Sequence, residues 1–235
     1  KSAESKWDAA AEKDVLYYIA TTACSNEEEF ILSGEYDAAK ILSGLRTFRP
    51  EKDRCLEIGC GIGRVLRAMN SNFRELYGID ISSQMIRRGE DWLKDFPNIK
   101  LLHLKECDFS VFEDDYFDFI YSYITFQHIS NLRVIERYVK EAYRLLRPGG
   151  IFRFQTLYSD SAYQIMKNRI RILLNRNSDT FAGYLWTYKE LRKFADRQNF
   201  DEALIEKKLP FESEAPYGDG QPESHIWVTF RKAAP

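Results

Sequence analysis

The sequence predicts a three-layer, doubly wound α/β fold: a seven-stranded, mostly parallel sheet with an antiparallel last strand, helices on both faces and a helical cap. Three observations lead to this prediction. Short apolar segments alternate with helical patterns from Arg54 onward, as in consecutive βαβ units. A glycine-rich turn at 59–63 follows the first apolar segment and opens a helix. An acidic residue, Asp80, ends the second apolar segment.

Two helical patterns precede the sheet. Apolar residues recur at helical spacing over 7–19 and again over 38–45, after the acidic stretch 26–30, and Pro50 ends the second pattern. We therefore predict a helical cap or lid over 1–50 and a core domain over 51–235, with a cap insert at about 157–186.

The core region supplies strands and helices in alternation. The predicted strands are 54–58, 75–79, 99–104, 117–123, 150–156, 203–209 and 226–231. The predicted helices are 64–69, 84–94, 131–146, 161–175 and 187 to about 199. The run 147–150, Arg-Pro-Gly-Gly, stops the third of these helices before a strand, and Thr187 with Glu190 forms a capping box at the last one.

Composition argues against several classes of protein. Of the 235 residues 44% are hydrophobic, which is enough for a core and too many for a disordered chain. The net charge of −2 argues against a dedicated nucleic-acid binder, so we expect no nucleic-acid partner. Basic residues lie along the helix predicted at 161–175, and we interpret them as a solvated helix face.

Cysteines and histidines give no sign of a metal site. The four cysteines form no C-x-x-C pair and the three histidines are scattered, so we expect free thiols in a reducing compartment and no metal. No apolar run reaches the ~18 residues of a membrane span, and the first residues lack the apolar region of a signal peptide. We expect a cytoplasmic protein without a membrane partner; its oligomeric state is not predicted.

The glycine turn differs from a dinucleotide-binding turn. Its pattern is G-x-G-x-G, so Gly63 comes one position earlier than in the G-x-G-x-x-G fingerprint, and Arg64 stands where the third glycine would be. Glu57 lies two positions before the first glycine. A carboxylate there would repel a pyrophosphate, and would suit a ligand with an ammonium group, such as the methionine part of S-adenosyl-L-methionine (SAM). Asp80, about 20 residues further on, is where a carboxylate accepts hydrogen bonds from ribose hydroxyls.

Five segments in order then resemble the motifs of class I SAM-dependent methyltransferases, especially the small-molecule branch that contains the ubiquinone-biosynthesis-type enzymes. They are E-I-G-C-G-I-G-R, Y-G-I-D-I-S, E-C-D-F-S, F-D-F-I-Y-S-Y-I-T-F-Q-H-I and E-A-Y-R-L-L-R-P-G-G-I-F. The resemblance covers 54–156; the chain outside it shows only the general layout of the family.

The resemblance implies SAM as cofactor, with S-adenosyl-L-homocysteine as product, and a set of binding residues. Glu57 would orient the methionine amino group, Asp80 the ribose and Asp108 the adenine amino group. For Ile81, Met85 and Phe109, packing in the core is the alternative. The whole set is Glu57, Gly59, Cys60, Gly61, Gly63, Asp80, Ile81, Met85, Asp108, Phe109, Ser122 and Tyr123.

His128 is the candidate general base for the methyl acceptor. It lies just past the carboxyl end of the fourth strand, where α/β sheets bind ligands, and an imidazole titrates near neutral pH. The alternatives are a histidine that caps the next helix or packs under a lid. The sequence 122–125, Ser-Tyr-Ile-Thr, replaces the Asn/Asp-Pro-Pro-Tyr/Phe motif that grips exocyclic amino groups of nucleic-acid bases.

The acceptor is expected to be small and organic, because the cap and the insert are rich in aromatic residues. Candidate acceptor or lid residues are Trp7, Tyr17, Tyr18, Gln127 and Trp186. The leading hypothesis is methyl transfer to such an acceptor, at oxygen. The alternatives are an RNA or protein methyltransferase and a SAM-binding protein without catalysis; Gly63 and Glu57 argue against an NAD-dependent oxidoreductase.

Overall fold

The computed structural model describes residues 3–13, 24, 26–45, 50–105, 107–174, 183–207 and 225–234. Its elements, in chain order, are α1 (Ala3–Lys13), α3 (Glu27–Ser43), β1 (Arg54–Ile58), α4 (Arg64–Ala68), β2 (Glu75–Asp80), α5 (Ser83–Trp92), β3 (Ile99–His103), β4 (Phe117–Ser122), η1 (Phe126–His128), α6 (Leu132–Leu145), β5 (Leu146–Tyr158), α7 (Ala162–Leu174), β6 (Leu185–Trp186), α8 (Tyr188–Ala195), β7 (Glu202–Glu206) and β8 (His225–Arg231).

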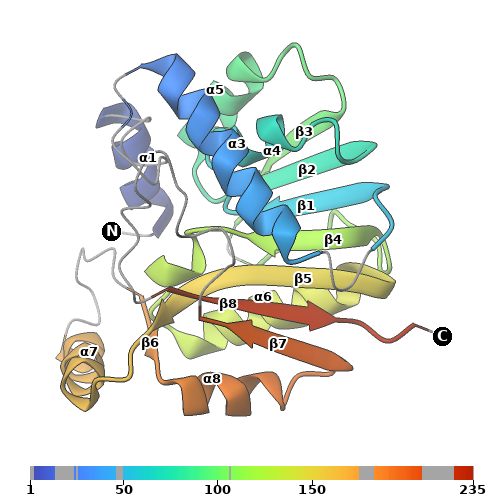
Figure 1. The fold of residues 1–235 in the computed structure, drawn as a ribbon. Coiled ribbons are helices and arrows are strands. Elements are labelled where there is room, and N and C mark those ends of the chain that lie inside the picture. The colour runs from blue at the N-terminus through green and yellow to red at the C-terminus, as the bar shows by residue number, and fades with distance from the viewer. Residues whose placement is uncertain are drawn as a thin grey trace.

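The strands form one sheet in the order β3-β2-β1-β4-β5-β8-β7, with β6 paired to β5 (Figure 1). Every pairing is parallel except those of β8, which runs antiparallel to β5 and to β7. The predicted mostly parallel sheet with a reversed last strand is therefore confirmed. The sequence missed β6, because its two residues are too short for an alternating pattern to show.

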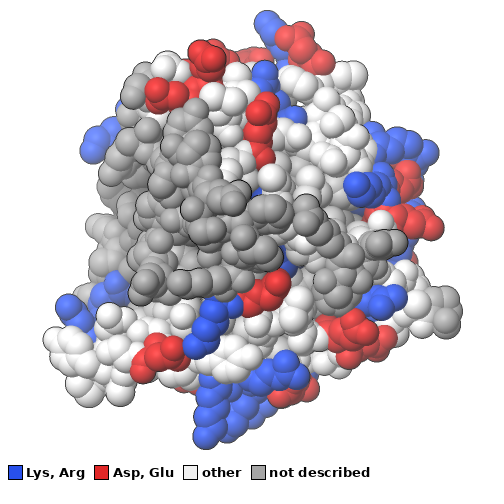
Figure 2. Space-filling view, in the orientation of Figure 1, with Lys and Arg blue, Asp and Glu red and all other residues white. Residues whose placement is uncertain are grey.

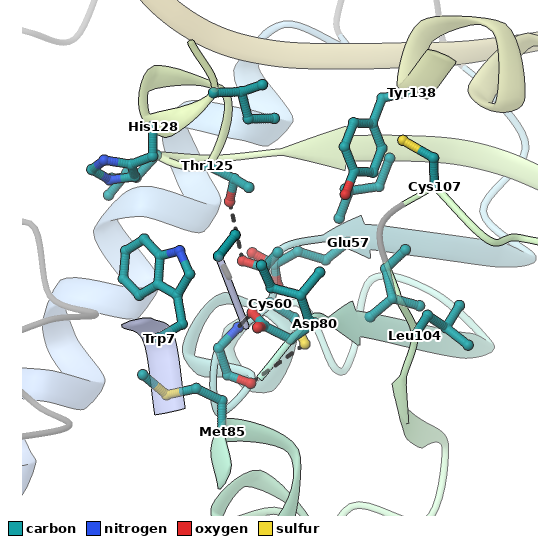
Figure 3. Close-up of a pocket in the computed structure, with 18 of the residues that line it drawn as sticks. Trp7, Glu57, Cys60, Asp80, Met85, Leu104, Cys107, Thr125, His128 and Tyr138 are labelled. Carbon is teal, nitrogen blue, oxygen red and sulfur yellow. Dashed lines mark hydrogen bonds between the residues drawn. The ribbon is translucent and has the colours of Figure 1, made fainter. Parts of the chain in front are cut away.

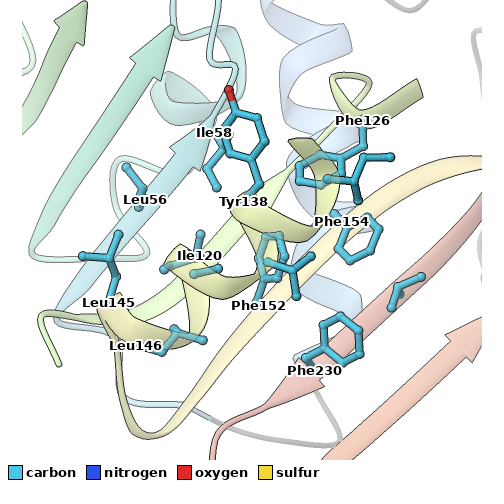
Figure 4. Packing of buried hydrophobic residues seen from close by; sticks show 14 of the residues in the cluster. Leu56, Ile58, Ile120, Phe126, Tyr138, Leu145, Leu146, Phe152, Phe154 and Phe230 are labelled. Carbon is cyan, nitrogen blue, oxygen red and sulfur yellow. The ribbon is translucent and has the colours of Figure 1, made fainter. Parts of the chain in front are cut away.

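Helices cover both faces of the sheet because successive side chains of a strand point to opposite faces. Leu56 and Ile58 of β1 pack with α6 and α8 in one cluster, which Figure 4 shows. Cys55 packs on the other face with Ala38 and Ile41 of α3 and with α4. The two clusters cover the two faces of the sheet. The edge at which the parallel strands end, with their carboxyl ends, is where a ligand site can form.

The helix predicted at 38–45 begins earlier, at Glu27. Asn26 caps it by accepting a hydrogen bond from the backbone N–H of Glu29. Three acidic residues in the first turn stabilise the helix by interacting with the positive end of its dipole. The acidic stretch that we placed before the helix is therefore its first turn. For the first predicted helix the structure describes α1 as far as Lys13; residues 14–19 lie outside the described part.

Two predicted boundaries of the core also differ. Strand β5 starts at Leu146, directly after α6, so Pro148 and Gly149 lie within the strand segment and not in a separate turn. A register shift between Phe117 and Phe119 of β4 accommodates this irregular start. The capping box of Thr187 and Glu190 is present, and α8 ends at Ala195, short of the predicted 199.

Candidate cofactor and acceptor site

A pocket of about 420 Å³ opens at the carboxyl ends of β1, β2 and β4 (Figure 3). The glycine turn after β1 forms its floor together with Asp80. Figure 3 shows Trp7 and His128 on one side and Leu104 and Cys107 on the other, with Glu57 and Asp80 between them. The pocket therefore combines an acidic centre with mostly apolar walls.

Asp80 organises the glycine turn. Its Oδ2 accepts a hydrogen bond of 2.9 Å from the backbone N–H of Gly61, and its Oδ1 one of 2.8 Å from that of Ser82. Burial raises the pKa of this carboxyl, while these backbone donors act in the opposite direction. Each oxygen keeps a lone pair that can accept a further hydrogen bond, for example from a ribose hydroxyl.

The turn leaves room for a ligand because Gly59, Gly61 and Gly63 carry no side chains. Gly59 has φ of 76°, and a Cβ there would collide with the side chain of Thr125. Thr125 Oγ1 in turn donates to the carbonyl of Gly59 at 3.2 Å, which joins the turn to the end of β4. Gly61 and Gly63 also have positive φ, so the run of backbone conformations explains the glycine spacing.

Glu57 is an acidic residue of the pocket that is almost completely buried. It is 3% exposed, and its Oε2 makes no hydrogen bond to the residues that the structure describes. Burial raises its pKa to about 8, against the opposing effects of the nearby Tyr121 hydroxyl and Arg64 guanidinium. A buried carboxylate oxygen without a donor is stabilised by an ammonium group or a water molecule. This fits the methionine end of SAM.

A buried ion pair that was not predicted from the sequence lies beside this carboxyl. Arg64 Nη2 lies 2.6 Å from Asp37 Oδ2, and both side chains are at most 2% exposed. Tyr123, at the end of β4, donates to Asp37 Oδ1 at 2.8 Å. Helical spacing could have indicated that Asp37 is buried, because it lies on the face of α3 that also carries Ala38 and Ile41, but it does not identify the partner. The network connects α3 to the pocket residues Arg64 and Tyr123.

The adenine side of the predicted site also lines the pocket. Ile81, Met85 and Phe109 are lining residues, with Met85 and Phe109 2% exposed. Asp108 is exposed; its Oδ1 accepts from the hydroxyl of Ser110 at 2.7 Å, which lowers the pKa of Asp108 and keeps its carboxylate charged. These positions agree with cofactor contact, and Phe109 also packs on Tyr138 in the core.

Trp7 and His128 form the opposite wall. Their rings meet edge to face with centroids 5.2 Å apart. Asp8 anchors α1 there, because its Oδ1 accepts from Ser82 Oγ at 2.6 Å and from the backbone N–H of Gln84 at 3.2 Å. The N-terminal helix therefore contributes directly to the pocket.

Four predicted site residues do not line the pocket. Gly63 caps α4, and a Cβ there would meet Leu93. Ser122 is buried and donates to the carbonyl of Ile58 at 2.8 Å. Trp186 is 3% exposed and packs in the core, and Gln127 contacts His128 from beside the pocket.

Tyr17 and Tyr18 lie outside the described residues. Within the described part of the chain no group of three acidic, histidine or cysteine side chains could hold a metal ion. No helix of this part is both long and apolar enough to cross a bilayer.

The parallel sheet with its reversed β8, the glycine turn after β1 and the acidic residue after β2 define the class I SAM-dependent methyltransferase domain. Residues 56–154 match a family model described as a methyltransferase domain, and the chain carries such a domain.

Named relatives are methyltransferases that act at different atoms. The chain is 27% identical over 184 residues to phosphoethanolamine N-methyltransferase 2 of Caenorhabditis elegans, covering 77% of the chain and 40% of the relative. It is 32% identical over 110 residues to malonyl-[acyl-carrier protein] O-methyltransferase of Enterobacter lignolyticus, covering 46% and 40%. The chain thus spans less than half the length of these two relatives.

A solved structure shares the fold. Haemonchus contortus phosphoethanolamine N-methyltransferase 2, in complex with phosphomonomethylethanolamine and S-adenosylhomocysteine, superposes with a TM-score of 0.66 at 19% identity, over 100% of this chain and 60% of the other.

Proposed function

We propose that the chain transfers the methyl group of SAM to a small organic acceptor, at an oxygen atom. The observation that carries this proposal is one pocket with two chemically distinct sides. Glu57, Asp80 and Asp108 supply carboxylates for a ligand with an amino group and hydroxyls, while Trp7 and His128 supply an aromatic wall beside a titratable imidazole.

SAM, when bound, supplies an electrophilic methyl group on a sulfonium sulfur. Glu57 accepts hydrogen bonds from the methionine ammonium, Asp80 from the ribose hydroxyls and Asp108 from the adenine amino group. Trp7 and Ile124 exclude water from the acceptor side. His128 takes the proton that an acceptor hydroxyl loses as its oxygen is methylated. The remaining contribution of the chain is alignment, which a displacement reaction needs most.

A role for residues 1–50 as a cap is part of the proposal. It is supported by Trp7 of α1 in the pocket wall and by the hydrogen bonds that hold Asp8 to the start of α5. A pocket walled by α1 and a net charge of −2 favour a small molecule over a nucleic acid.

Two measurements test the proposal. Calorimetry should show that SAM and S-adenosylhomocysteine bind and that NAD does not; equal or tighter binding of NAD would overturn the class of cofactor. Incubation with SAM and a pooled small-molecule library should give a product heavier by one methylene group in the mass spectrum. Products with added methyl groups on RNA or protein substrates, and none from the library, would favour the macromolecular alternative. SAM binding without any product would favour a protein that binds SAM but does not catalyse.

A further inference from the structure

Helix α7 carries most of the large hydrophobic side chains that are exposed in the described residues. Eight large hydrophobic side chains are exposed in the described residues, and five of them belong to this one helix of 13 residues. The five are Tyr163 (67% exposed), Met166 (55%), Ile170 (48%), Leu173 (63%) and Leu174 (75%). Single exposed apolar residues are ordinary, but a contiguous group marks an interaction surface.

These five side chains form a stripe along α7. At 3.6 residues per turn they fall within an arc of about 100°. Asn168 projects from the opposite side of the helix and is buried; its Nδ2 donates to the carbonyl of Gly183 at 3.1 Å, and its Oδ1 accepts from the N–H of Leu185 at 3.1 Å. The hydrogen bonds of Asn168 fix the rotation of the helix, so the apolar stripe faces outward.

The charges on α7 all have one sign. The helix contains Lys167, Arg169 and Arg171 and no acidic residue. On the helical wheel Arg169 flanks one edge of the stripe, and Lys167 and Arg171 flank the other. The Glu190 carboxylate accepts two hydrogen bonds of 3.0 and 3.1 Å from Arg169, which holds Arg169 at its edge of the stripe. Lys167 is exposed. Figure 2 shows a largely uncharged surface at the lower left corner of the molecule, where Figure 1 places α7, with basic atoms above it and acidic atoms beside it.

We propose that the stripe of α7 docks on the surface of an anionic lipid bilayer. An outward apolar stripe with cations along its edges is the pattern of a helix that lies in the interface of a membrane. The exposed Lys167 is the side chain that would reach the lipid phosphates, since Arg169 pairs with Glu190 and Arg171 donates to the carbonyl of Gly183 at 3.4 Å. This proposal replaces the expectation of no membrane partner. That expectation rested on the lack of a membrane-spanning segment, and such a lack does not bear on a helix that lies flat on the membrane surface.

Other occupants fit the stripe less well. A second copy of the chain, paired stripe to stripe, would bring the cations of two helices together. RNA would match the charges, but single-stranded RNA is held by stacking on aromatic rings, and four of the five side chains are aliphatic.

The stripe lies at the same edge of the sheet as the pocket. Helix α7 follows the carboxyl end of β5, and Asn168 binds the segment 183–185. That segment in turn pairs with η1, since Gly183 N–H donates to Gln127 O and Tyr184 N–H to Ile129 O at 2.7 and 2.9 Å. His128 lies between these two partners and lines the pocket. A bilayer bound at α7 thus lies at the edge of the molecule where the acceptor would enter.

Vesicle sedimentation tests the proposal without any need for SAM or an acceptor. The full chain should sediment with vesicles of phosphatidylcholine and phosphatidylglycerol at low salt, and less with phosphatidylcholine alone or at high salt. The double variant Ile170→Glu/Leu173→Glu should weaken partitioning by at least about tenfold, because it removes two apolar side chains and adds two negative charges.

Val111→Glu is the matched control, since Val111 is 54% exposed and lies outside α7. It should sediment like the wild type. Thermal unfolding should be similar for all three proteins, because every substituted position is exposed. The proposal is overturned if the wild type does not bind anionic vesicles, or if Val111→Glu loses as much binding as the double variant. It is also overturned if size-exclusion chromatography shows that the wild type is a dimer and that the double substitution acts only by dissociating it.

Discussion

The Nε2 atom of His225 lies 2.6 Å from Oε1 of Gln127. The Nε2 atom of Gln127 lies 3.3 Å from Nε2 of His128, so one carboxamide bridges two imidazoles. A carboxamide oxygen only accepts and its nitrogen only donates. In this orientation His225 donates from Nε2, while Nε2 of His128 accepts and the proton of neutral His128 resides on Nδ1. Gln127 thus positions the imidazole that faces the pocket.

The first prediction concerns this bridge. In Gln127→Glu the nitrogen donor becomes a carboxylate oxygen, which only accepts. Neutral His128 should then move its proton from Nδ1 to Nε2. Imidazole ¹⁵N NMR distinguishes the two tautomers, and the chain has only three histidines to assign. His103 contacts neither Gln127 nor His128 in the structure and is the internal reference. An Nε2–H tautomer of His128 already present in the wild type would contradict the prediction.

The second prediction concerns Asp80. Asp80→Ala removes the acceptor that we assign to the ribose hydroxyls, and hydrogen bonds to charged groups contribute about 1.5–3 kcal/mol each. Affinity for SAM, measured by calorimetry, should fall at least about tenfold. The backbone donors of Gly61 and Ser82 also lose their partner, so the midpoint of thermal unfolding should fall as well. Glu113→Ala, at an exposed acidic side chain on the loop before β4, should change neither quantity. Unchanged affinity in Asp80→Ala would mean that another group holds the ribose.

The third prediction concerns the pH dependence of stability through Glu57. Its pKa in the folded chain is raised to about 8 from an ordinary 4.5, chiefly by burial. The folded state therefore binds more protons than the unfolded state between these values, and stability falls as the pH rises toward 8. Glu57→Gln has no proton to lose there. From pH 5 to pH 8 its free energy of unfolding should therefore fall by roughly 3–4 kcal/mol less than that of the wild type. If denaturant titrations show that the free energy of unfolding falls equally with pH in the two proteins, the prediction is wrong.

The sheet and its ligand edge could be predicted because each rests on local patterns. Apolar segments that alternate with helical patterns indicate parallel strands. Gly59, Gly61 and Gly63 mark three positive φ angles at alternate positions of one turn. Asp80 was predictable because it ends a strand that directly neighbours β1.

What sequence could not show depends on residues that meet across the fold. The pairing of Asp37 with Arg64 joins residues 27 positions apart, and that of Gln127 with His225 joins residues 98 apart. Trp186 was grouped with the acceptor residues because it is aromatic and lies in the insert, but its ring packs between Tyr184 and Phe194. Periodicity carries no information on such contacts.

The fourth prediction concerns the buried ion pair. Asp37→Ala leaves the Arg64 guanidinium charged and 2% exposed, which typically costs about 3–5 kcal/mol of stability. It also removes the acceptor of Tyr123. The double variant Asp37→Leu/Arg64→Met should recover a large part of the loss, because it removes both charges and fills the space with apolar atoms. Denaturant unfolding measures both. A double variant at least as unstable as Asp37→Ala would show that the pair acts by more than mutual charge compensation.

The last prediction concerns His128 as the general base. His128→Ala should lower the turnover number by roughly 10²–10⁴-fold, the usual range for acid–base catalysis. Affinity for SAM should stay nearly unchanged, because Glu57 and Asp80, which we assign to the cofactor, belong to β1 and β2 and not to the segment of His128. The wild-type rate should fall at acidic pH as the imidazole takes up a proton, and the variant should lack this limb.

The bridge through Gln127 adds a second signature. When Nε2 of His128 takes a proton, the carboxamide of Gln127 has to turn so that its oxygen faces that proton, and His225 then loses its acceptor. His225→Ala should therefore change the pH profile of turnover while leaving the affinity for SAM intact. A loss confined to the KM of the acceptor in His128→Ala would make His128 a binding group. An unaffected rate would remove it from the mechanism and favour an acceptor that is already deprotonated, such as a carboxylate.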